Sequence, residues 1–101
     1  MIVLSYTTKY SNNIKEDAEK DFRDRTKFAR MIVMENLYSF NDEQIKGGKK
    51  PPVKHGVKKE QIFLTDEDYE LIGKVAKHYN MSINKLISFI INQYYENKIN
   101  N

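Results

Sequence analysis

A basic segment rich in glycine and proline divides this 101-residue chain into two parts. Residues 46–59 read KGGKKPPVKHGVKK and hold six lysines, no acidic residue, both prolines and three of the four glycines. This composition has neither helical nor strand periodicity and is typical of a solvated linker or arm. Regular structure is therefore expected in the two flanking stretches, and a stretch of about 45 residues is marginally stable on its own.

Composition and motif content exclude several classes of protein. The chain has no cysteine, which rules out disulfides, thiolate metal sites and cysteine nucleophiles. It has no apolar run approaching the roughly 20 residues of a membrane span and no secretory signal, so we expect a cytoplasmic protein without a membrane partner. No catalytic, phosphate-loop or metal-binding motif is present, and we expect neither an enzyme nor a bound cofactor or metal.

The part before the basic segment, residues 1–45, predicts a short strand followed by one long helix. Residues 2–6 are β-prone, residues 11–13 (SNN) are a turn signal, and an amphipathic stretch runs from about Ile14 to Phe40. Acidic residues gather in the early turns of that stretch, where the helix dipole favours them. Its apolar face is predicted from residues at steps of three and four: Ile14, Ala18, Phe22, Ala29, Ile32, Val33, Leu37 and Phe40.

The part after the basic segment predicts a strand, a helix, a tight turn and a second helix. Residues 61–64 are β-prone, and the TDED sequence at residues 65–68 is a helix start with a capping threonine. That helix should run to about residue 79, where Asn80 is suited to a left-handed cap. Ser82 then caps a second helix that carries a wide aliphatic stripe and ends near residue 98. No internal repeat is evident in the sequence.

A single strand in this second part leaves the backbone groups on its edges unpaired. Pairing with the same strand of a second chain about a two-fold axis would satisfy them and would give an obligate homodimer, which we expect. The alternative is pairing with residues 2–6 of the same chain.

The run QIFLTDEDYELIGKVAKHYNMSINKLISFIINQYY resembles the ribbon-helix-helix family, the β-ribbon DNA-binding proteins of the Arc and MetJ type. The resemblance rests on the I-x-L-T strand, the acidic capped helix, the turn and the aliphatic second helix, and it covers about residues 57–98. It implies a mostly α fold with a short β-ribbon, in which two chains intertwine and their antiparallel ribbon enters the DNA major groove. The chain then divides into an N-terminal extension (1–45), a basic linker (46–57) and a ribbon-helix-helix domain (58–98).

The strand would supply the contacts to bases. Side chains alternate along a strand, so if Ile62 and Leu64 face the core, then Lys59, Gln61 and Phe63 face the groove. Lysine can reach guanine or a phosphate, glutamine can bond adenine, and phenylalanine can contact only a thymine methyl or stack. Phe63 departs from the polar residue usual in the family at this position.

Contacts to DNA phosphates are expected from two further places. The resemblance implies that the start of the second helix grips a phosphate, here through Ser82, Asn84 and Lys85. The lysines of the basic segment would add sequence-independent attraction: Lys49, Lys50, Lys54 and Lys58. The alternative interpretation makes Ser82 only a helix cap and the basic segment only a tether. Glu60 also departs from the family pattern, because the family often has an apolar residue there, and it places a negative charge near the phosphates.

These observations predict a small DNA-binding transcriptional repressor that binds double-stranded DNA. A plasmid partition protein or a conjugative relaxosome accessory protein fits the same residues, as does a winged helix-turn-helix that would use the second helix. A protein-interaction adaptor is the remaining alternative. The charged surface of the N-terminal helix is the candidate contact for a protein partner or for higher-order assembly on repeated sites.

Overall fold

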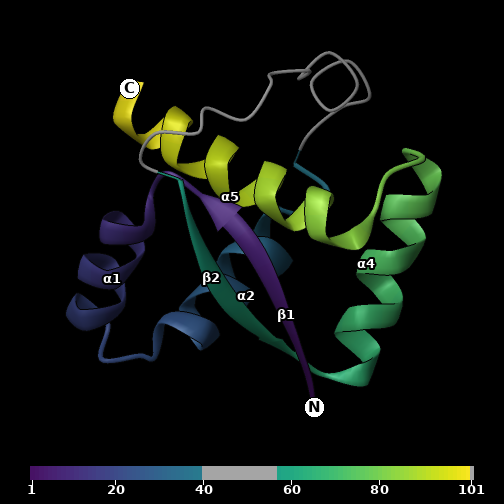
Figure 1. Ribbon diagram of the computed structural model, residues 1–101, viewed down its shortest axis with the longest axis horizontal. Helices are drawn as coiled ribbons and strands as arrows, with labels where there is room; N and C mark the ends of the chain where they lie inside the picture. The colour runs from purple at the N-terminus through teal and green to yellow at the C-terminus, as the bar shows by residue number, and fades with distance from the viewer. Residues whose placement is uncertain (40–56, 101) are drawn as a thin grey trace.

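The computed structural model describes residues 1–39 and 57–100 and arranges them as two successive strand-helix-helix units (Figure 1). These residues are mostly helical and contain one two-stranded sheet, as the sequence predicts. The elements before residue 40 are β1 (Ile2–Thr8), α1 (Ser11–Lys20) and α2 (Arg25–Asn36), and those after residue 56 are β2 (Lys58–Leu64), α4 (Asp66–His78) and α5 (Ile83–Asn100).

The two strands form an antiparallel ribbon within one chain. Ile2 lies opposite Leu64, and Ser5 lies opposite Gln61 at the middle of both strands. The strand of the second part therefore pairs with the strand of the first part. This is the pairing that the sequence left open as the alternative.

The outer edge of β1 is closed by side chains of α5. The Asn84 amide donates to the Ser5 carbonyl at 2.6 Å, and the Thr7 amide donates to the Ser88 hydroxyl at 3.1 Å. These bonds satisfy backbone groups that an edge strand would otherwise expose. A further strand could join β1 at this edge only by displacing α5.

The hydrophobic core draws on both sides of the basic segment. Helix α2 packs against β2, helix α5 packs against β1, and α2 and α5 pack against each other. One buried cluster joins them, made of Tyr6, Tyr10, Ile14, Ala18, Phe28, Ala29, Ile32, Val33, Leu37, Ile62, Leu64, Ile72, Ala76, Leu86, Ile87, Ile90, Ile91 and Tyr95. Each part, marginal alone, thus buries the apolar surface of the other.

The predicted single N-terminal helix is wrong. The helix begins at Ser11, so the expected turn at residues 11–13 lies inside α1, and it breaks at residues 21–24 before α2 begins. Phe22, placed on the apolar face by its spacing, is instead 96% exposed and has a φ of 56°. The break lets α1 and α2 each turn an apolar face toward the core, which one straight helix could not do. Phe40 lies outside the described residues.

The helices of the second part confirm the sequence signals. Thr65 and Asp68 form the predicted capping box, in which each residue's amide donates to the other's side chain at 3.1 Å. Helix α4 ends at His78, and Asn80 in the turn that follows has the expected left-handed φ of 55°. The Met81 amide then donates to the Ala76 carbonyl at 3.0 Å, which closes the turn before α5.

Candidate nucleic-acid interface

Six side chains share the outward side of the ribbon, because residues directly opposite each other in an antiparallel pair lie on the same face. We call this surface the outer ribbon face: Val3, Ser5 and Thr7 from β1, and Lys59, Gln61 and Phe63 from β2. On the opposite side, Ile62 and Leu64 are 0% and 1% exposed. The alternation predicted for β2 is therefore confirmed.

The predicted base-contacting residues differ in accessibility. Lys59 and Gln61 are exposed, whereas Phe63 is half-buried. Strand β1 adds two exposed hydroxyl side chains, Ser5 and Thr7, opposite Gln61 and Lys59. Sequence reasoning missed the β1 residues because it treated them as part of an extension. The same alternation, applied to the IVLSYTT strand, would have found them.

Glu60 lies on the inner side of the ribbon. Its side chain is 12% exposed, accepts a hydrogen bond from the Ser11 hydroxyl and lies 3.6 Å from Arg25 Nη1. Its charge is thus compensated inside the fold. The outer ribbon face carries one cation, Lys59, and no acidic side chain.

The start of α5 lies beside the ribbon, where the phosphate contact was predicted. Ser82 accepts a hydrogen bond from the Lys85 amide at 3.2 Å, which is the cap role of the alternative interpretation. Asn84 uses its amide to bond the Ser5 carbonyl, so this side chain positions α5 against β1. Lys85 is exposed next to it. The structure therefore brings these three residues to the flank of the ribbon and gives two of them structural contacts.

The lysines of the basic segment fall mostly outside the described residues. Lys49, Lys50 and Lys54 lie in residues 40–56. Lys58, the first residue of β2, is exposed and sits opposite Thr8 at the end of the ribbon.

Helix α5, the recognition helix of the helix-turn-helix alternative, is built into the core. Four of its aliphatic residues are 0% exposed: Leu86, Ile87, Ile90 and Ile91. Two polar side chains bond β1, since Ser88 accepts from the Thr7 amide and Asn92 accepts from the Thr8 hydroxyl at 2.6 Å. These contacts hold α5 along β1 and occupy polar groups that a recognition helix would present to bases.

Comparison with protein-family models, with curated proteins and with solved structures gives no match for this chain. Within the part of the chain that the structure describes, no helix combines the length and apolar character needed to cross a membrane. Across those same residues, no three histidine, cysteine, aspartate or glutamate side chains gather as candidate metal ligands.

Proposed function

We propose that this protein binds double-stranded DNA in a sequence-specific manner by inserting the β1–β2 ribbon into the major groove. The observation that carries the proposal is the outer ribbon face, which exposes Ser5, Thr7, Lys59 and Gln61 and has no acidic side chain. The major groove of B-DNA, about 12 Å wide, admits a two-stranded ribbon. The resemblance of residues 57–98 to ribbon-helix-helix proteins favours the same surface.

The side chains of this face match the chemistry of base edges. Gln61 can bond the N6 and N7 atoms of adenine with both ends of its amide, and Lys59 can donate to guanine O6 or N7. The hydroxyls of Ser5 and Thr7 can donate or accept. Both residues at the other end, Val3 and Phe63, offer apolar contact to a thymine methyl group.

Charge complementarity to the DNA backbone supports the same partner. Residues 46–59 carry six lysines without an acidic residue and lead directly into β2. Each lysine that neutralises a phosphate adds about 0.9 to the salt slope of binding. Exposed Lys85 beside β1 extends the basic surface to the flank of the ribbon. A small repressor is the role we assign, with plasmid partition or conjugative transfer as alternatives that use the same surface.

The test is selection of duplexes bound by the full chain from a random DNA pool at about physiological ionic strength, where non-specific attraction is screened. We expect a short enriched motif. Gln61→Ala should then lower the affinity for that motif by about 5- to 150-fold in fluorescence anisotropy, since a bidentate base contact is worth about 1–3 kcal/mol. The matched control is Gln93→Ala on α5, whose side chain donates to Asn97.

The outcomes separate the possibilities. If Gln61→Ala left the preferred motif and the affinity unchanged, the ribbon would not be the base-contacting element. If no motif were enriched, sequence-specific DNA binding itself would be excluded.

An adaptor function is favoured by one separate observation. Phe22, 96% exposed at the α1–α2 turn, borders a hollow that is also lined by Met31, Met34 and Phe63. Phe22 is exposed and the other three side chains are half-buried. An exposed aromatic ring beside accessible methionines is typical of protein-binding surfaces. If the selection enriched no DNA motif, this surface would be the next candidate binding site, with a protein as its partner. Phe22→Ser should then abolish binding of that partner.

A further inference from the structure

The two halves of the chain repeat the same turn between helices. Phe22 and Asn80 are the two non-glycine residues with positive φ in residues 1–39 and 57–100, at 56° and 55°. In each turn the amide after the left-handed residue donates to an alanine carbonyl, that of Ala18 at 2.9 Å and that of Ala76 at 3.0 Å. Each of these residues in the second half lies 58 positions after its counterpart in the first.

The same spacing holds along the second helix of each half. Five buried residues of the α2 region correspond one by one to five buried residues of α5: Phe28 to Leu86, Ala29 to Ile87, Ile32 to Ile90, Val33 to Ile91 and Leu37 to Tyr95. The first turns match as well, because the Phe28 amide donates to the Asp24 carbonyl as the Leu86 amide donates to the Ser82 carbonyl. The residue types differ, which is why the repeat escapes notice in the sequence.

The two halves are intertwined about an approximate two-fold axis. Each second helix packs on the strand of the other half, α2 on β2 and α5 on β1, and the two second helices meet. Leu4 and Ile62, which are also 58 positions apart, lie directly opposite each other across the ribbon. Figure 1 shows α1 and α4 on opposite sides of that ribbon. One chain thus supplies both halves of an arrangement that an isologous dimer would build from two identical chains.

The outer ribbon face breaks this two-fold relationship. The two strands contribute different side chains to this face: Val3, Ser5 and Thr7 come from β1, whereas Lys59, Gln61 and Phe63 come from β2. A homodimer has two identical strands, and its operator mirrors that symmetry as an inverted repeat. A ribbon with two different strands presents unlike hydrogen-bonding groups to the two halves of its site.

We propose that a single chain is the complete DNA-binding unit and that its target is one asymmetric duplex sequence. This inference rests on the proposed function and goes beyond it, because it fixes the stoichiometry and the symmetry of the target. It also replaces the homodimer expected from the sequence, in which the strand of residues 58–64 pairs with its own copy.

The test measures the mass of the full chain by sedimentation, free and bound to its selected duplex. We expect a 12.0-kDa monomer, one chain per duplex, and a selected motif without inverted symmetry. Two chains per duplex on an inverted repeat would overturn the inference and leave the proposed function intact. Absence of any enriched motif would overturn both together, so the two failures are distinguishable.

A substitution on β1 tests whether the first half contacts bases. Ser5→Gln places a second glutamine directly opposite Gln61, and Asn84 bonds only the main-chain carbonyl of residue 5, so that bond is kept. We expect the variant to select a motif with an added adenine preference at its centre. Ser39→Gln, at an exposed position after α2, is the matched control and should leave the motif unchanged. An unchanged motif with Ser5→Gln would overturn the contribution of β1 and with it the inference.

Discussion

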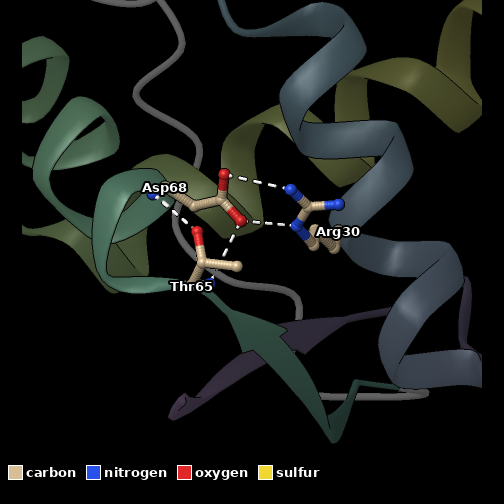
Figure 2. Close-up of polar contacts among 3 residues, drawn as sticks. All are labelled: Arg30, Thr65 and Asp68. Carbon is tan, nitrogen blue, oxygen red and sulfur yellow. Dashed lines mark hydrogen bonds and ion pairs between the residues drawn. The ribbon is translucent and has the colours of Figure 1, made fainter.

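Arg30 on α2 binds the carboxylate of Asp68 in the first turn of α4 through two of its nitrogens (Figure 2). Nη2 donates to Oδ1 at 3.1 Å, and Nε donates to Oδ2. The same carboxylate accepts the Thr65 amide in the capping box. One side chain therefore connects the half of the chain before the basic segment to a helix N-terminus in the half after it.

Loss of this contact should destabilise the fold. Arg30→Met leaves Asp68, which is 7% exposed, without its guanidinium partner. We expect the free energy of unfolding to fall by about 1–2 kcal/mol. The loss is no larger because the Arg30 side chain is 44% exposed and solvent screens the pair. Urea denaturation measures the loss. Lys27→Met is the control, because its pair with Asp24 is 4.0 Å long and exposed and should contribute less than about 0.5 kcal/mol. Equal effects of the two variants would contradict a structural role for Arg30.

The same carboxylate predicts a pH dependence of stability. The Arg30 guanidinium, followed by the Thr65 amide and hydroxyl, lowers the pKa of Asp68 below its ordinary value of 3.8. A lowered pKa in the folded state contributes stability above the ordinary value, and this contribution is lost as the pH falls through the folded pKa. The stability difference between the wild type and Asp68→Asn should therefore be constant above about pH 5 and shrink below about pH 4. A stability difference between the two proteins that did not change between about pH 2 and pH 7 would contradict this role of the Asp68 carboxylate.

Local signals explain what the sequence predicts well. Thr65, Asn80 and Ser82 mark a helix start, a left-handed cap and a second helix start, and each acts through neighbouring backbone groups. The α1–α2 turn has the same geometry, but its left-handed position holds Phe22, a residue type that gives no turn signal. The sequence therefore predicts one long helix where two exist.

Long-range pairing explains the part of the candidate site that sequence reasoning missed. The alternation along β2 depends on that strand alone and placed Lys59 and Gln61 correctly on the exposed side. The partner of β2 is distant in sequence, and short β-prone runs do not specify which of two possible strands they pair with. Half of the outer ribbon face, Ser5 included, could not be assigned until the pairing was known.

Loss of the hydroxyl should affect the stability of the fold differently at two buried tyrosines. Within the described residues the Tyr6 hydroxyl is buried without a hydrogen-bond partner, whereas the Tyr95 hydroxyl donates to Asp17 at 3.0 Å. Burial raises the pKa of both phenols. Tyr6→Phe should be neutral or stabilising, and Tyr95→Phe should cost about 1–2 kcal/mol, because only the second loses a bond to a charged group. Thermal unfolding of the two variants and the wild type measures these changes in stability. If Tyr6→Phe were destabilised, the Tyr6 hydroxyl would have a hydrogen-bond partner.

The left-handed turns predict a stabilising substitution. A positive φ is sterically unfavourable for a bulky residue such as Phe22, whose side chain is 96% exposed. Asn80 adopts the same conformation at the equivalent position at a lower steric cost. Phe22→Asn should raise the free energy of unfolding by about 0.5–1.5 kcal/mol, and Asn80→Phe should lower it by a similar amount. A loss of stability in Phe22→Asn would show that the aromatic ring makes a contact that keeps it in place.

Separating the two halves should abolish the independent fold of each. Without residues 1–45, β2 loses its partner β1 and α5 loses both β1 and α2, so Leu86, Ile87 and Ile90 would become exposed. We expect a fragment of residues 46–101 to show no cooperative thermal transition as a monomer, measured by circular dichroism with the mass checked by sedimentation. Adding a fragment of residues 1–45 should restore the transition, because the strands and second helices of the two halves complete each other without a covalent link. A cooperatively folding monomer of residues 46–101 would contradict the intertwined core, whereas a folded dimer of that fragment would mean that β2 can also pair with its own copy once β1 is removed.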